Sequence, residues 1–206
     1  MRRLFLTLCL ALGLGLPGLA LAQAAKPAPK PPSNSEQAIF AGGCFWCMEH
    51  DMKAIVGVTA VMSGYTGGTL LNPRYEDVVR ETTGHYESVR VTFDPSKISY
   101  AQLLDRYWPL VDPTDDGGQF CDRGPSYRPA VFVTPAQRPI AEASRAKWAA
   151  KLKSGMMKTQ IVNASRFYDA EAYHRNFSET NSLRYNGYRQ GCGRDARLVR
   201  VWGRNP

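Results

Sequence analysis

The sequence predicts an α+β fold, a two-layer sandwich in which helices pack on a mixed β-sheet (ferredoxin-like). Three observations predict it. Segments with the period of two that is typical of strands alternate with segments of helical period. The connections between them are short, and at least one pair of strands is expected to be antiparallel. The length suits one folded domain, and the chain contains no internal repeat.

Two segments without globular character come before this domain. Residues 1–22 are typical of a secretory signal peptide, with Arg2 and Arg3 ahead of an apolar run that ends at Ala20-Leu21-Ala22. Residues 23–36 are a linker rich in Pro, Ala and Lys, which cannot bury apolar surface. The folded domain is therefore expected over residues 37–206, in an exported protein of the periplasm or the exterior.

The first half of the domain predicts three strands and two helices. The second strand is expected to stop at the glycine-rich stretch 64–68, and Pro73 lies in the first turn of the short second helix. In order, these elements are a strand over 38–41, a helix over 44–55, a strand over 58–64, a short helix over 72–79 and a strand over 86–93.

The second half is less regular. Ser99 is the expected cap of an amphipathic helix, Pro109 and Pro113 end it, and no periodicity is visible beyond Tyr173. The expected elements are a helix over 99–110, a loop-rich stretch over 111–127 with a solvated acidic run at 112–116, a strand over 130–133, a helix over 135–152 and a strand over 159–162.

The charge of the chain disfavours one large class of partner. The formal net charge is +8, and removing the leader takes away two arginines and no acid, which leaves +6. These charges are spread along the chain without a basic cluster interleaved with aromatics, so nucleic-acid binding is not expected. The apolar run of the leader is short for a membrane span, and stable membrane insertion is not expected either.

The most informative motif is Gly42-Gly43-Cys44-Phe45-Trp46-Cys47, where a strand gives way to helical spacing. A thiol at a helix N-terminus meets unpaired N–H groups, and this predicts a lowered pKa and a reactive Cys44. The alternative is a buried structural cysteine or an ordinary disulfide. Two adjacent aromatics favour the reactive site, because Phe45 and Trp46 are costly on a surface unless they line a pocket.

Two further features indicate redox and acid chemistry. After removal of the leader, which contains Cys9, four cysteines remain at 44, 47, 121 and 192. This number is sparse for a disulfide-stapled small fold, so redox chemistry is plausible for some of them. In the strand over 86–93, Glu87 is in line with the apolar face of Val89, Val91 and Phe93. A buried carboxyl beside a reactive site would have a raised pKa and carry a proton, although a solvated strand edge is the alternative.

Five ordered motifs resemble the A-type peptide methionine sulfoxide reductases, over nearly the whole chain from Ala38 to Cys192. They are Gly43-Cys44-Phe45-Trp46, Gly64-Tyr65-Thr66-Gly67-Gly68, Asn72-Pro73-Arg74-Tyr75, Thr83-Gly84-His85-Tyr86-Glu87-Ser88-Val89 and Tyr127-Arg128-Pro129-Ala130-Val131-Phe132. The resemblance implies an enzyme that reduces the S epimer of methionine sulfoxide, free or in proteins, through a cysteine sulfenic acid. The domain over 37–206 would then be the catalytic domain.

The same resemblance implies roles for individual residues. Cys44 would be the nucleophile and Glu87 the acid that protonates the sulfoxide oxygen. Phe45 and Trp46 would cradle the substrate methyl group. The oxygen would be hydrogen-bonded by Tyr75 and Tyr127, and Asp122 would be the acidic neighbour preceding Tyr127. This assignment agrees with the chemistry, since negative charge grows on the oxygen as the sulfur is attacked.

A second thiol is needed to resolve the sulfenic acid. Cys47 is one helical turn from Cys44, a separation compatible with a disulfide. Cys192 lies among Gly187, Gly191 and Gly193 and matches the mobile glycine-rich tail from which many family members supply a resolving cysteine. We expect both in the relay, in an order left open. Cys121 stands where the family often has asparagine and is expected to be a small buried residue.

Other interpretations also fit some of these residues. The main rival is a periplasmic thiol-disulfide oxidoreductase of thioredoxin type, which also uses two cysteines three apart. Another is a non-catalytic secreted binding module. A zinc site of Cys44, Cys47, His50 and His85 has unusual spacing, and His85 is expected to be structural. Tyr173-His174 either shapes the pocket or only packs. No bound cofactor or metal is expected, electrons would come from a thioredoxin-like dithiol, and the protein is expected to be monomeric.

Overall fold

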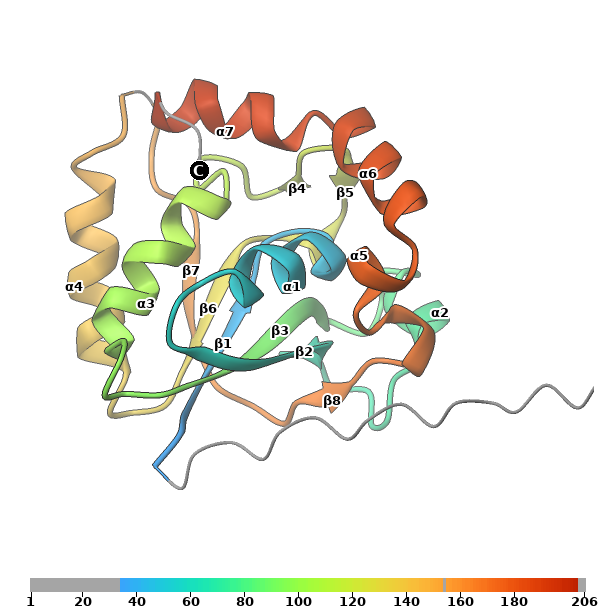
Figure 1. Ribbon diagram of the computed structural model, residues 1–206, viewed down its shortest axis with the longest axis horizontal. Coiled ribbons are helices and arrows are strands. Elements are labelled where there is room, and N and C mark those ends of the chain that lie inside the picture. The colour runs from blue at the N-terminus through green and yellow to red at the C-terminus, as the bar shows by residue number, and fades with distance from the viewer. Residues whose placement is uncertain (1–33, 154, 204–206) are drawn as a thin grey trace, which may run out of the picture. The chain divides into compact units, whose positions relative to one another are not determined.

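The computed structural model describes residues 34–153 and 155–203 (Figure 1). The predicted signal peptide and all but the last three residues of the predicted linker lie outside this part of the chain. The described part is built on a six-stranded sheet in the order β7-β6-β1-β3-β2-β8. Its strands are β1 Glu36–Ala41, β2 Val58–Thr66, β3 Tyr86–Phe93, β6 Ala130–Val133, β7 Gln160–Asn163 and β8 Tyr168–Asp169; a separate hairpin pairs β4 Gly118–Gln119 with β5 Asp122–Arg123.

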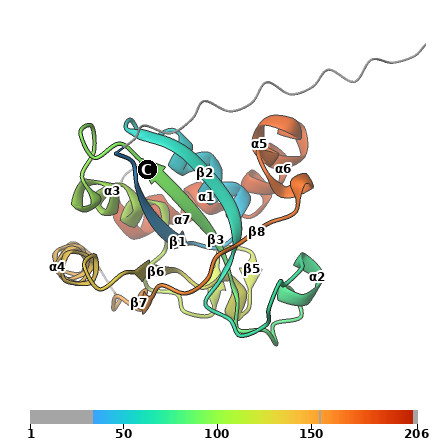
Figure 2. The ribbon, with the colours of Figure 1, turned by 90° about the horizontal axis from the view of Figure 1, so that it is seen from below.

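The sheet is mixed, as expected. β1 pairs antiparallel with both β3 and β6, and β2 pairs antiparallel with both β3 and β8, whereas β6 and β7 run parallel. With helices packed on this sheet (Figure 2), the predicted α+β sandwich is confirmed.

Seven α-helices complete the described part of the chain. They are α1 Phe45–Lys53, α2 Tyr75–Val78, α3 Tyr100–Tyr107, α4 Arg138–Ala149, α5 Phe177–Thr180, α6 Ser182–Gly191 and α7 Arg194–Trp202. The predicted cap of α3 is present, since the Ser99 hydroxyl accepts a hydrogen bond from the Gln102 N–H. Within residues 34–153 and 155–203, each helix is too short or too polar to span a bilayer.

The core lies between one face of the sheet and helices α1, α3 and α4. Phe40 on β1 and Val89 and Val91 on β3 are fully buried against Met48 and Met52 of α1. Because side chains alternate along a strand, Glu87 lies on the same face as Val89 and Val91. This register places a carboxyl at the edge of the apolar core, next to the start of α1.

Two expectations about the elements are corrected. β2 continues to Thr66, because Tyr65 and Thr66 still pair with Glu87 and Tyr86, and the chain turns only at Gly67, where φ is +89°. The C-terminal region is mostly helical although its sequence shows no clear period. Its short helices are placed by isolated buried side chains, Phe177, Tyr185 and Leu198.

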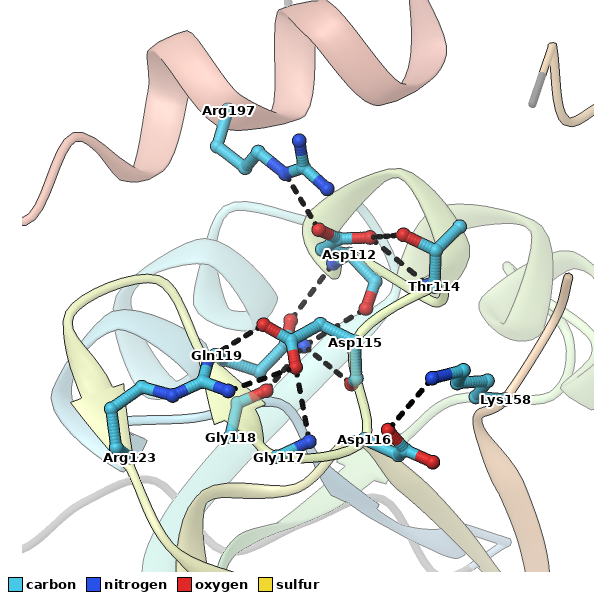
Figure 3. Close-up of polar contacts among 10 residues, drawn as sticks. All are labelled: Asp112, Thr114, Asp115, Asp116, Gly117, Gly118, Gln119, Arg123, Lys158 and Arg197. Atoms are coloured by element: carbon cyan, nitrogen blue, oxygen red, sulfur yellow. Dashed lines mark hydrogen bonds and ion pairs between the residues drawn. The ribbon is translucent and has the colours of Figure 1, made fainter. Parts of the chain in front are cut away.

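The acidic run at 112–116 is not simply a solvated loop. Asp112 is only 2 % exposed, and its carboxylate pairs with Arg197 of α7 at 2.6 Å. The Gln119 side-chain amide accepts a hydrogen bond from the Asp112 N–H and donates one to the Asp112 C=O (Figure 3). Asp115 binds Arg123 across the β4–β5 hairpin. The buried, hydrogen-bonded Asp112 and Gln119 hold this segment in place beside the β4–β5 hairpin, which carries Cys121 and Asp122.

Candidate active site

Cys44 lies at the N-terminus of α1, directly after β1 and a turn of two glycines. Gly43 has a φ of +80°, which favours glycine. A Cβ on Gly42 would lie 2.5 Å from the Met48 Sδ and 2.7 Å from Val111, so a side chain there would displace these two buried residues. The glycines therefore let the chain reverse tightly and put Cys44 at the N-cap of α1.

The thiol of Cys44 is buried, with 7 % of the residue exposed. It shares a hydrogen bond with the Cys47 thiol and another with the Tyr188 hydroxyl. Burial, the contact with Cys47 and the charge of Glu87 raise the pKa of Cys44 well above its ordinary value. The expected lowering is therefore wrong for the resting site, because desolvation outweighs the helix N-terminus.

Within this thiol pair Cys47 is the more acidic partner. The hydrogen bond from Cys44 and the positive charges of Arg194 and Arg189 lower the pKa of Cys47 to about 7, against the effect of burial. The resting site therefore holds a protonated Cys44 beside a Cys47 that is readily ionised.

Glu87 is 2 % exposed, on the face of β3 that meets the N-terminus of α1. Its Oε2 accepts a hydrogen bond of 3.0 Å from the Phe45 N–H. Burial raises the pKa of Glu87 to about 8, although this hydrogen bond opposes the shift. The predicted burial of this carboxyl is confirmed, and its raised pKa favours the protonated form at neutral pH.

Tyr75 and Tyr127 come from separate elements and meet near Glu87. Tyr75 begins α2, where its N–H donates to Glu171 at 2.9 Å, and Tyr127 ends a 3-10 turn over Pro125–Tyr127. The two hydroxyls are hydrogen-bonded to each other. Burial raises the pKa of Tyr75 to about 12 and that of Tyr127 further, so both phenols remain donors.

The two aromatics after Cys44 lie in different environments. Phe45 is 1 % exposed. The half-buried Trp46 ring stacks on Phe177 at 3.7 Å between ring centres, and its Nε1–H donates to His174 Nδ1 at 3.0 Å. The His174 ring is also 4.4 Å from that of Tyr75. His174 therefore contacts both Trp46 and Tyr75, two of the predicted site residues.

Asp122 is connected to Cys44 through Tyr188, a residue that the sequence did not indicate. Its Oδ2 accepts a hydrogen bond of 2.5 Å from the hydroxyl of Tyr188 on α6, and that hydroxyl also contacts Cys44. Tyr188 thus connects the β4–β5 hairpin to Cys44. No signal in the sequence identified it, because α6 lacks a clear apolar period.

The cysteines pair differently from the expectation. Cys121 and Cys192 form a disulfide, with their Cα atoms 4.8 Å apart, while Cys44 and Cys47 are free. The prediction that Cys121 is a small buried residue is wrong, since it is exposed on the turn between β4 and β5. The glycine-rich segment is not a free tail either, because α6 spans Gly187 and Gly191 and ends at Cys192.

The residues considered for zinc do not come together. His85 is buried and accepts from the Gly68 N–H through Nδ1, so its Nε2–H donates to the Leu70 carbonyl. This is the structural role that was expected. His50 is exposed and its ring lies 5.1 Å from that of Tyr185. Neither histidine joins Cys44 and Cys47 in a ligand cluster within the described residues.

Comparison with known proteins agrees with this geometry. A family model described as peptide methionine sulfoxide reductase matches residues 36–205. Peptide methionine sulfoxide reductase MsrA 2 of Caulobacter vibrioides is 69% identical over 82% of this chain and 86% of that protein. MsrA of Bacillus subtilis is 47% identical over 82% of this chain and 96% of that protein.

Solved structures share the fold. Reduced Mxr1 from Saccharomyces cerevisiae superposes with a TM-score of 0.70 at 26% identity, covering 75% of this chain and 90% of that one. Methionine sulfoxide reductase A of Corynebacterium diphtheriae gives 0.66 at 28% identity, covering 74% and 77%. The matching family and the buried thiol, acid and phenols lead to one conclusion: this chain belongs to the A-type peptide methionine sulfoxide reductases, thiol-dependent oxidoreductases that reduce methionine sulfoxide and so repair oxidised proteins.

Proposed function

We propose that Cys44 reduces the S epimer of methionine sulfoxide, free and in proteins, with Glu87 as the proton donor. The observation that carries this assignment is the pairing of a buried thiol with a carboxyl that is protonated at neutral pH. Glu87 bonds the backbone N–H of the residue that follows Cys44, so the two groups are held at one end of α1.

The reductive step follows from this geometry. The sulfoxide oxygen would lie among the Glu87 carboxyl and the hydroxyls of Tyr75 and Tyr127, with the methyl group against Phe45 and Trp46. Attack by the Cys44 sulfur on the substrate sulfur transfers the oxygen to Cys44, and the oxygen takes up protons as charge develops on it. The products are methionine and a Cys44 sulfenic acid.

Cys47 is the proposed direct resolving thiol. It is hydrogen-bonded to Cys44 and is the more acidic of the two thiols, so its thiolate is available to attack the sulfenic acid. A Cys44–Cys47 disulfide forms and water leaves. Cys192 remains a predicted member of the recycling step, now through its bond to Cys121.

The electrons for recycling are proposed to come from a thioredoxin-like dithiol. Yeast Mxr1 has also been solved in complex with Trx2. The leader over residues 1–22 supports the proposal that this enzyme works in the periplasm or outside the cell, where its partner must also be. We propose that it acts as a monomer.

Reduction of dabsyl-methionine sulfoxide tests the proposal against its main rival. With dithiothreitol as electron source, the full domain should convert this substrate and should not accelerate insulin disulfide reduction beyond the rate with dithiothreitol alone. A thioredoxin-type oxidoreductase would give the reverse result. Insulin reduction without sulfoxide reduction would therefore refute the proposed function.

The pocket predicts selectivity for one epimer. With the methyl group between Phe45 and Trp46, exchanging the oxygen and the lone pair on sulfur moves the oxygen away from Glu87. A racemic mixture should therefore be consumed to about one half, with the R epimer left. Chiral chromatography of the exhausted reaction measures this, and full consumption by pure enzyme would contradict the pocket geometry.

The reductive step on Cys44 can be measured separately from the recycling step. In the variant Cys47→Ser/Cys192→Ser, Cys44 should still give one rapid equivalent of methionine, while turnover with a thioredoxin-like reductant stops because no disulfide forms on Cys44. Quenched-flow product analysis and steady-state assays measure the two steps.

Single substitutions order the relay. Cys192→Ser should still form the Cys44–Cys47 disulfide, which peptide mapping detects after one equivalent of substrate. Sustained turnover of the double variant would mean that Cys121 resolves the intermediate or that the reductant attacks the sulfenic acid itself. The assignment of Cys47 as the resolving thiol would then be wrong.

A further inference from the structure

The resolving thiol is covered by the C-terminal helices. Cys47 is 2 % exposed and packs in a small cluster with Phe177 of α5 and Tyr185 of α6, to which Tyr188 adds its ring. A dithiol protein reduces a disulfide by direct attack of its thiolate on one of the sulfurs. With α5 and α6 in this position, a Cys44–Cys47 disulfide would be closed to a protein reductant.

Helix α6 buries little of its own surface, and besides the polar contacts of Tyr188 and Arg189 it is anchored near both ends. Among its ten residues only Tyr185 is fully buried. Gly187 and Gly191 are poor helix formers, and nothing lies within 4 Å of where a Cβ would be, so packing does not require glycine there. Before α5, the Asn176 N–H donates to the buried Glu49 carboxylate, and after α6 the Cys121–Cys192 disulfide fixes the chain to the β4–β5 hairpin.

The Cys121–Cys192 disulfide is accessible to a protein reductant, whereas Cys44 and Cys47 are not. Cys121 is exposed on its hairpin turn and Cys192 is half-buried, whereas Cys44 and Cys47 are both buried. One helical turn before Cys192, Tyr188 contacts Asp122 and Cys44. The disulfide therefore ties together the exposed hairpin, the cover of Cys47 and the hydrogen bonds around the nucleophile.

We propose that the Cys121–Cys192 disulfide is a second redox site, a latch that the dithiol partner opens before it reduces Cys44–Cys47. The closed latch holds α6 over Cys47 and Tyr188 against Cys44. The open latch leaves the C-terminal end of α6 held by weaker polar contacts such as the Arg189–Asp51 ion pair. This inference rests on the proposed function, since it concerns access to a disulfide formed during sulfoxide reduction.

The opening step is an ordinary thiol–disulfide exchange. A thiolate of the partner attacks the Cys121 sulfur, the bond to Cys192 breaks, and Cys192 leaves as a thiolate that takes up a proton. The second thiol of the partner then attacks the mixed disulfide and releases Cys121. The latch gains two electrons and two protons in all, and the partner dithiol becomes a disulfide.

The test starts from the fully oxidised protein. This state is prepared by treating the enzyme with one equivalent of methionine (S)-sulfoxide, which produces the Cys44–Cys47 disulfide. Reduced thioredoxin is then added. Samples taken over time are alkylated, and peptide mapping shows which disulfide has opened. We expect the Cys121–Cys192 bond to open before the Cys44–Cys47 bond. In Cys121→Ser/Cys192→Ser, thioredoxin should reduce Cys44–Cys47 about tenfold faster than in the wild type, because the latch no longer has to be opened first.

A matched variant acts on the same helix without touching any sulfur. Gly187→Ala/Gly191→Ala fills open space and strengthens α6, so reduction of Cys44–Cys47 by thioredoxin should be slower by about threefold or more. Dithiothreitol, which is much smaller, should show a weaker dependence on both variants.

The outcomes separate the two proposals. A Cys121–Cys192 bond that stays closed while thioredoxin drives turnover would overturn the latch, and so would equal rates of Cys44–Cys47 reduction in the wild type and the serine variant. If the serine variant fails to fold, the wild-type time course still decides. Absence of the first equivalent of methionine in the wild type would instead refute the proposed sulfoxide chemistry.

Discussion

Replacing Cys44 with serine is expected to abolish methionine formation, lowering the rate of the reductive step by roughly 10⁴-fold or more. Serine lacks both the nucleophilic thiolate and the capacity to carry the oxygen as a sulfenic acid. Single-turnover assays with excess enzyme measure the effect without any contribution from recycling.

The fold should survive this substitution. Serine is close in size to cysteine, and its hydroxyl can keep the hydrogen bond to Tyr188. The thermal unfolding midpoint and the Cys121–Cys192 disulfide provide the controls. Activity within tenfold of the wild type in a folded Cys44→Ser variant would remove Cys44 from the mechanism.

Glu87→Gln should slow the reductive step by roughly 10² to 10⁴-fold, the usual contribution of a general acid. The amide oxygen still accepts from the Phe45 N–H, but the amide does not release a proton to the sulfoxide oxygen. Glu49→Gln is the matched control, because Glu49 is also 2 % exposed and bonds Ser63 and Asn176 instead of the Phe45 N–H. It should change the rate far less.

The pH profile adds a second signature of Glu87. With its pKa raised to about 8, the carboxyl is protonated below that pH and loses its proton above it. The single-turnover rate should therefore fall as pH rises beyond about 8, and this falling limb should vanish in Glu87→Gln. A rate that does not change with the substitution would show that Tyr75, Tyr127 or solvent supplies the proton.

The sequence predicted the sheet and the acid well because both depend on local periodicity. The alternation from Tyr86 to Phe93 placed Glu87 on the buried face, and the glycine pair before Cys44 marked the turn into α1. The strand β2 was cut short because Gly64 was treated as a break, yet its backbone stays paired to Ser88. A glycine in a strand interior weakens the strand without necessarily ending it.

The features that the sequence did not predict share a physical cause, because each depends on contacts between segments far apart in the chain. The raised pKa of Cys44 follows from its burial in the folded protein, and α6, which carries the Tyr188 hydroxyl that contacts Cys44, has no readable period. Cys121 and Cys192 are 71 residues apart, and the sequence contains no feature that pairs them. Burial of Asp112 likewise depends on Gln119 and on Arg197 from the last helix.

Trapping the oxidised cysteine tests the central claim most directly. The Cys47→Ser variant is mixed with one equivalent of methionine (S)-sulfoxide and a reagent specific for sulfenic acids, and the labelled peptides are mapped by mass spectrometry. The proposed mechanism predicts one methionine formed for each label, with the label on Cys44. Methionine formed with the label on Cys121 or Cys192, or with no label on Cys44, would contradict it.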